Sequence, residues 1–212
     1  MNVIKDLLIK LRFSFYVMTR PFDGFWDLKN EKRGSVGAAM VILFFVILAR
    51  IIVRQYTGFV FNQNDLTELN LINEVAGVIL PFVLWCVANW ALTTLFDGEG
   101  NFKEIVMFSA YALVPYVIIN IPLAFISQGL IDSEGAFITF FSNLGVAWSG
   151  FLLFVGTLTI HQYTPGKTFG IILFIIIGMG IILFIGMLFF ILIQQMINFV
   201  ISFIKEIALR LA

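Results

Sequence analysis

Charged residues are scarce in this chain. Only 12% of its 212 residues are Asp, Glu, Lys or Arg, and 60% are hydrophobic. Soluble globular domains have about 25% charged and roughly 45 to 50% apolar residues. A chain with so little charge cannot cover its apolar surface with polar side chains in water. The composition therefore excludes an ordinary soluble domain and predicts a protein embedded in a lipid bilayer.

Cysteine and histidine are almost absent, since Cys86 and His161 each occur once. One cysteine can form neither an internal disulfide nor a cysteine zinc cluster. His161 follows Ser149 by twelve residues on one predicted helix, so the two side chains lie ~18 Å apart, too far for a nucleophile and its base. The HExxH and Walker A motifs are also missing. The sequence therefore predicts no catalytic, metal or cofactor site.

Long apolar segments are what the chain does contain. Five are long enough to cross a hydrocarbon core of ~30 Å, which requires about 20 helical residues. They do not alternate in polarity as barrel strands do, so we expect an all-α polytopic fold with five transmembrane helices. The predicted spans are approximately residues 35–53, 75–96, 105–125, 140–161 and 168–193.

The last apolar segment does not stop at residue 193. It meets Gln194 and Gln195 and then continues to residue 204. This length is too great for one upright span, which predicts a tilted fifth span followed by an interfacial segment. The expected organisation is a cytoplasmic N-terminal segment (1–34), a five-helix domain (35–204) and a short C-terminal tail (205–212).

Basic residues are distributed asymmetrically. Residues 1–34 contain seven Lys and Arg side chains, whereas the loops at 55–74 and 126–139 contain none. The positive-inside rule places the N-terminus in the cytoplasm, and five crossings place the C-terminus outside. Because the basic residues gather beside the bilayer, we expect lipid contact and no nucleic-acid partner.

The N-terminal segment combines an amphipathic pattern with an aromatic and basic cluster. Leu7, Leu8, Leu11 and Phe15 recur at helical spacing, which favours a helix in the headgroup plane over a short helix packed under the bundle. The cluster that follows contains aromatic rings suited to headgroup depth and cations suited to anionic lipid. Its candidate lipid-contact or partner-contact residues are Phe22, Phe25, Trp26, Lys32 and Arg33.

The third predicted span is the most unusual of the five, because it contains two prolines seven residues apart. Pro115 and Pro122 each remove a backbone donor, so the helix should be kinked and its freed carbonyl groups need other partners. The candidate residues of this kinked core are Tyr111, Pro115, Tyr116 and Asn120. Hydrogen bonding between helices is the simpler interpretation, and a substrate path is the alternative.

Two short features flank the second predicted span. Arg50 and Arg54 lie one turn apart near the outer end of the first span, at the level of Glu74, which predicts an ion pair. At the other end, Gly98 and Gly100 predict a tight turn with positive φ angles, and Asn101 predicts a cap for the next helix.

The order of these features resembles the Yip1 domain. The resemblance rests on the segment 20–35, the loop 98–104 and the run Tyr111-Ala112-Leu113-Val114-Pro115-Tyr116, which is similar to the Tyr-x-Leu-x-Pro signature of bacterial members. It extends from about Thr19 to about Gln195. The Asp-Leu-Tyr-Gly-Pro motif and longer cytosolic tail of eukaryotic relatives are missing, so the resemblance is to the bacterial branch.

This resemblance implies a multi-pass protein of the bacterial inner membrane that is not an enzyme. It would organise the membrane or assist partner membrane proteins, such as a transporter complex, or form a homo-oligomer. The alternative is a small-solute or lipid transporter or channel, in which the kinked third helix lines a polar cavity.

Overall fold

The computed structural model describes residues 3–62 and 70–211, and every regular element in this part of the chain is a helix. Five helical segments are long and apolar enough to cross a membrane, which confirms the predicted fold class. Residues 63–69, in the predicted loop 55–74, lie outside the described residues. The α-helices are α1 (Val3–Thr19), α2 (Pro21–Asn30), α3 (Val36–Tyr56), α4 (Leu71–Leu95), α5 (Phe102–Ala112), α6 (Val114–Ile126), α7 (Gly135–His161) and α8 (Pro165–Leu211).

The third span, formed by α5 and α6, is the centre of the bundle. In the most apolar part of this span, 56% of the residues are buried. In the corresponding part of each other span, 33% or less are buried. It packs against α3, α4 and α7, as well as the two N-terminal helices. Ile105, Phe108 and Tyr111 are fully buried there, so this span contributes several of the largest side chains of the core.

The predicted kink in this span lies at Leu113, between α5 and α6. Pro115 occupies the first turn of α6, where its missing N–H group is tolerated best. Leu113 donates instead to the Ala110 carbonyl at 3.1 Å, which tightens the end of α5. Pro122 remains inside α6 without interrupting it. Only the first of the two prolines therefore divides the span.

The two N-terminal helices pack against the bundle through one face. Val17 and Leu28 are buried in the main core, and the Tyr111 hydroxyl donates to the Lys10 carbonyl of α1 at 3.1 Å. The opposite face of α1 leaves Leu8 and Phe15 exposed. The amphipathic pattern thus divides α1 between a face that covers the core and a face that is free to meet lipid.

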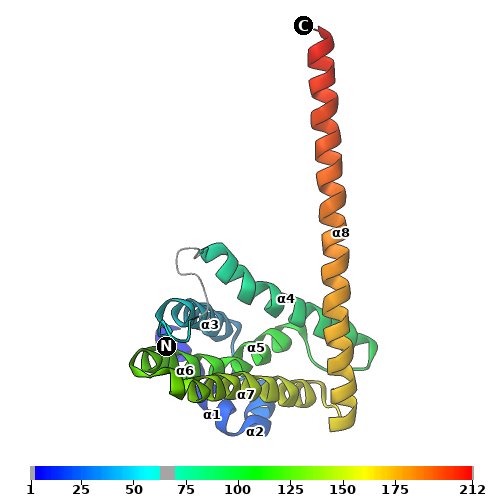
Figure 1. The fold of residues 1–212 in the computed structure, drawn as a ribbon. Helices are drawn as coiled ribbons and strands as arrows, with labels where there is room; N and C mark the ends of the chain where they lie inside the picture. Colours follow the sequence, from blue (N-terminus) through cyan, green and yellow to red (C-terminus); the bar gives the residue numbers. More distant parts are fainter. Residues whose placement is uncertain (1–2, 63–69, 212) are drawn as a thin grey trace.

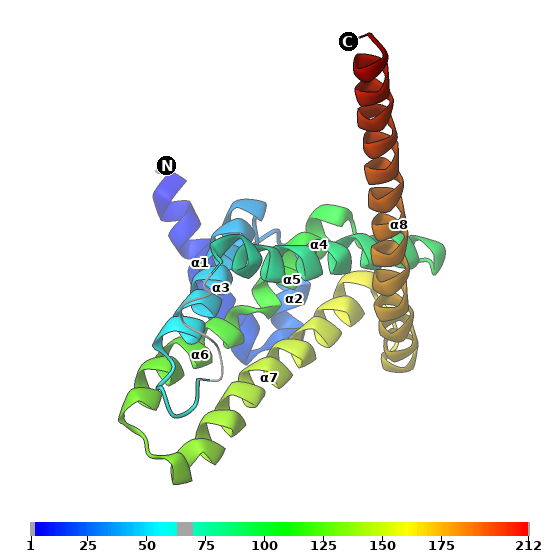
Figure 2. The same cartoon turned by 45° about the horizontal axis from the view of Figure 1, so that its top comes forward.

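The last helix, α8, is continuous from Pro165 to Leu211. No break occurs at Gln194 and Gln195, and residues 205–211 are helical, so within the described residues no change in secondary structure marks the expected boundaries between span, interfacial segment and tail. Glutamine has a high helix propensity, and a polar side chain alone does not end a helix. Figures 1 and 2 show the C-terminal part of α8 extending away from all other helices.

The close approach of α7 to the central span generates a stability prediction. A Cβ atom at Gly156 would lie 2.5 Å from Cδ2 of the buried Phe108 ring, whereas nothing lies within 4 Å of a Cβ atom at Gly150. We expect Gly156→Ala to destabilise the fold by about 1 to 3 kcal/mol through overpacking. Gly150→Ala, on the same helix, should remain within about 1 kcal/mol of the wild type. Unfolding of the purified protein in detergent measures both, and equal stabilities would contradict this packing.

Candidate functional site

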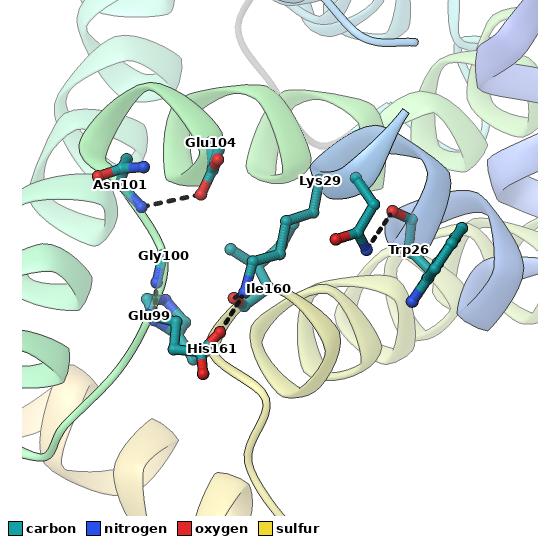
Figure 3. A network of polar contacts seen from close by, with 9 residues as sticks. Trp26, Lys29, Glu99, Gly100, Asn101, Glu104, Ile160 and His161 are labelled. Carbon is teal, nitrogen blue, oxygen red and sulfur yellow. Dashed lines mark hydrogen bonds and ion pairs between the residues drawn. The ribbon is translucent and has the colours of Figure 1, made fainter. Parts of the chain in front are cut away.

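A polar network joins α2, the loop between α4 and α5, and the end of α7 (Figure 3). The Lys29 ammonium group donates to the Glu99 carboxylate at 2.8 Å and to the Ile160 carbonyl at 2.9 Å. Ile160 lies in the last turn of α7, whose carbonyl groups lack helical partners. One cation therefore holds the loop and supplies a donor to the end of a spanning helix.

His161 completes this network and fixes the loop against α4. The Gly100 N–H donates to His161 Nδ1 at 3.2 Å, so Nε2 carries the proton. Nε2 then donates to the side-chain oxygen of Asn89 at 3.1 Å. Both side chains are buried, and a neutral histidine with one donor and one acceptor satisfies both ring nitrogens without a buried charge.

Gly98 and Gly100 are needed here for close approach. A Cβ atom at Gly98 would lie 2.6 Å from His161 Nδ1, and one at Gly100 would lie 2.7 Å from His161 Cε1. Neither glycine has a positive φ angle, so the predicted use of these residues is wrong. Asp97 takes the left-handed conformation instead, at φ 57°. The left-handed residue of the turn is therefore Asp97, one position before Gly98. Both glycines instead pack closely against the His161 ring.

Tyr163 and Lys167 satisfy the end of α4. The Tyr163 hydroxyl donates to the Phe96 carbonyl at 3.1 Å, and the Lys167 ammonium group donates to the same oxygen at 2.8 Å. The cation also lies 4.4 Å from the centre of the Tyr163 ring. Burial, aided by the Asp97 carboxylate, raises the Tyr163 pKa, so its hydroxyl remains a donor at neutral pH.

The start of α5 is capped as predicted. Asn101 is the N-cap residue, and its N–H donates to the Glu104 carboxylate at 2.9 Å. Glu99 binds Lys29 and Glu104 binds the Asn101 N–H, so both of these acidic residues have partners within the chain. Among residues 3–62 and 70–211, no group of three or more His, Cys, Asp or Glu side chains is placed to hold a metal ion. The polar contacts described at this end of the molecule join α2, the loop between α4 and α5, and the end of α7 to one another.

The predicted ion-pair residues lie together at the far end of α3 and the start of α4. Glu74 is only 2% exposed, and one of its oxygens accepts from Arg50 Nε at 2.8 Å. Its other oxygen accepts from Arg54 Nη1. A carboxylate removed from water requires such compensation. The arrangement fixes the first two spans against each other where the chain passes between them.

The kinked-core residues of the third span do not converge on one site. Tyr111 reaches α1, whereas Asn120 accepts from the Ser142 hydroxyl of α7 at 2.9 Å. The Asn120 amide also donates to the Tyr116 carbonyl at 3.0 Å, and Pro115 opens α6. These contacts are side-chain bonds between neighbouring helices or within one turn, as expected for interhelical hydrogen bonding.

The predicted contact cluster of α2 is divided between core and surface. Phe25 is fully buried and its ring lies edge-on to Phe108 at 6.1 Å, so it cannot contact lipid or a partner. Phe22 and Trp26 are exposed. Lys32 is exposed too, and the Arg33 guanidinium binds the carboxylates of two nearby acids, Asp27 and Glu31.

Residue type alone could not separate the aromatic side chains of α2, because a ring suits both a core and a headgroup layer. The contacts of His161 with Asn89 and Gly100 were also difficult to predict from the sequence. The available signal was a histidine at the end of one predicted span and Asn89 near the matching end of another. Two buried polar side chains at one depth require partners, and here they are each other.

The buried carboxylate of Glu74 generates the second prediction. Glu74→Gln removes the charge that compensates two guanidinium groups, and we expect a loss of about 3 to 5 kcal/mol in unfolding free energy. Glu206→Gln breaks the exposed pair with Arg210 on α8, so it should change stability by less than about 1 kcal/mol. Unfolding in detergent compares the two variants. A Glu74→Gln protein as stable as the Glu206→Gln control would contradict the role given to this pair.

Comparison with known proteins agrees with this architecture. A model of the Yip1 domain matches residues 15–203, which includes the first four spans, most of the fifth span, the loop around Gly98 and the kinked central helix. No curated protein and no solved structure matches the chain. The family match covers most of the sequence and confirms the resemblance found in its motifs. The chain belongs to the Yip1 domain family.

Proposed function

We propose that this protein is a non-enzymatic integral membrane protein that assists partner membrane proteins, such as a transporter complex, and that α8 supplies the contact. Yip1 family proteins are generally not known as enzymes. The polar groups described above bind one another, which suits a structural role better than a catalytic one. The lipid bilayer is the environment that its five apolar helices require.

The observation that carries this proposal is the exposure of α8. Only the first part of the helix packs against the bundle, through Ile171 and Ile175 and through Gly178, which approaches Leu92 of α4. From Phe184 to Arg210, every side chain that the structure describes is exposed. A long apolar helix left uncovered by its own chain is suited to contact lipid and other membrane helices.

The length of α8 argues that lipid alone does not cover it. Its apolar part, Pro165–Ile207, has 43 residues, which corresponds to ~64 Å, about twice the ~30 Å thickness of a hydrocarbon core. Gln194 and Gln195 lie within this apolar part, and neither has a hydrogen-bond partner among the described residues. Amide side chains in such a position favour a hydrogen bond to another helix. A partner helix alongside α8 would satisfy both requirements.

The polar pairs disfavour the alternative of a channel or solute transporter. A conducting path needs several polar groups at one place along the bundle. Here Asn120 binds Ser142, Asn89 binds His161, and the Trp85 indole donates to Ser109 at 3.0 Å. Each pair lies between a different set of helices. This pattern supports a bundle held by separate hydrogen bonds.

The location of the protein is part of the same proposal. The seven basic residues in the segment 1–34 support a cytoplasmic N-terminus in the cell membrane, with the C-terminus outside. The exposed Phe22, Trp26 and Lys32 of α2 would then meet the cytoplasmic headgroup layer, whose anionic lipids attract cations.

Affinity purification of the full chain in mild detergent, with quantitative mass spectrometry, tests this function. The test variant combines Leu188→Ala, Ile191→Ala and Gln195→Leu, which lie on one face of α8. The control combines Leu80→Ala and Val83→Ala, two exposed apolar positions on α4. We expect a near-stoichiometric membrane partner whose recovery falls about tenfold with the α8 variant, equivalent to roughly 1.4 kcal/mol, and is unchanged in the control.

Three results would contradict the proposal. The wild-type chain could purify without a stoichiometric membrane partner, or only as copies of itself. The α8 variant could also recover its partner as well as the control does, which would place the contact elsewhere on the molecule.

A further inference from the structure

A cavity of about 530 Å³ lies within the spanning bundle, between α3, α4, the central span and α7. Its volume falls within the roughly 300 to 1,000 Å³ typical of small-molecule sites. None of the contacts proposed for α8 involves this cavity, so it is an independent feature of the molecule. Most of its wall is apolar, with side chains such as Phe82, Leu113 and Leu153.

The two ends of the cavity differ in chemistry. At one end the Arg50 guanidinium packs beside Gly77, one residue before the lining residue Val78. At the other end Trp85 and Ser109 are already bound to each other. Val78 and Trp85 lie seven residues apart on α4, or ~10 Å. The cavity therefore has one cationic end and one end whose polar groups are satisfied.

Arg50 has capacity for a further ligand. Only its Nε atom has a hydrogen-bond partner among the described residues, the Glu74 carboxylate. A guanidinium group carries five N–H donors, so four remain. The side chain is 47% exposed and lines the cavity next to Tyr116. A planar donor group of this kind suits the oxygen atoms of a phosphate.

Ser149 provides a second and independent indication of a ligand. It lines the cavity from α7, is only 5% exposed, and its hydroxyl oxygen has no hydrogen-bond partner within the described chain. A buried hydroxyl without a partner is unfavourable. Ser149 lies between Val146 and Leu153 along the α7 wall, so a carbonyl oxygen of a ligand held midway along the cavity would accept its hydrogen bond.

The cavity opens toward the surroundings of the bundle on the α7 side. Val146 is exposed there, and nothing lies within 4 Å of a Cβ atom at Gly150. Both residues belong to a predicted membrane span. The ligand would therefore enter sideways from the bilayer, which supplies molecules with a polar head and an apolar chain.

We propose that this cavity binds one anionic phospholipid. Its phosphate receives hydrogen bonds from Arg50 and Tyr116, an ester carbonyl accepts from Ser149, and an acyl chain lies along Phe82 and Leu113. An anionic lipid is preferred over a zwitterionic lipid, because the phosphate of a zwitterionic lipid is already accompanied by the cation of its own headgroup. The site would hold a structural or regulatory lipid inside the bundle and needs no partner protein.

Native mass spectrometry of the full-length protein tests this site. The protein is released from bilayers of equimolar phosphatidylglycerol and phosphatidylcholine with identical acyl chains. We expect about one retained lipid per chain and about tenfold enrichment of phosphatidylglycerol, equivalent to roughly 1.4 kcal/mol. A parallel sample with added inorganic phosphate separates the two sources of phosphate, and the lipid should remain bound there.

Three variants localise the binding. Gly150→Phe places a ring at the mouth of the cavity without a backbone clash, and it should reduce lipid retention about tenfold. Gly180→Phe is the matched control, because Gly180 on α8 also has open space at its Cβ position and does not line the cavity. Arg50→Gln should remove the preference for phosphatidylglycerol, and unfolding in detergent verifies that each variant is folded.

The proposal would be overturned by equal retention of the two lipids in the wild-type protein, or by displacement of the lipid by inorganic phosphate. Unchanged retention in Gly150→Phe would also overturn it, and this variant decides the matter even where Arg50→Gln fails to fold. Because partner recovery through α8 is measured separately, failure of the lipid site leaves the proposed function standing.

Discussion

The central span is the element on which the rest of the structure depends. A helix in hydrocarbon must satisfy its own backbone groups, and Pro115 prevents this at one point, so the chain divides into α5 and α6 at Leu113. The buried rings of α5 then bind the N-terminal helices, as Phe108 meets Phe25. On α6, Asn120 binds Ser142 of α7. This span contacts the N-terminal helices, α3, α4 and α7, so it is a neighbour that all of them share.

Two groups of polar residues lie at opposite ends of the bundle, where they connect segments distant in the sequence. Glu74 joins α3 to α4 at one end, and His161 with Lys29 joins α2, α7 and the loop of Gly100 at the other. Such bonds have few competitors in an apolar environment, so each defines a specific pairing of helices. The outer surface of the bundle carries mainly apolar side chains. The largest part of it belongs to α8, because only 11% of the residues in the most apolar part of this helix are buried.

The number of spans and the pairing of Glu74 could be predicted from the sequence. The length of each apolar helix, and the depth at which a residue lies along it, follow directly from counting residues. The unbroken α8 could not be predicted, since Gln194 has a high helix propensity and gives no sign of whether an apolar helix continues as a span or at an interface. The burial of Phe25 depends on which neighbour its ring meets, and residue type does not contain that information. The close packing of Gly98 could not be predicted either, because a glycine required for close approach looks the same in sequence as one required for positive φ.

Photo-cross-linking along α8 in native membranes tests the central claim most directly. A photoreactive residue is introduced one position at a time from Phe184 to Val200, and the adducts of each variant are identified as protein or lipid. A partner helix alongside α8 predicts protein adducts at every third or fourth position, including Leu188 and Gln195, and lipid adducts on the opposite face. Lipid adducts alone at every position would contradict the account, because α8 would then be covered by the bilayer without a partner.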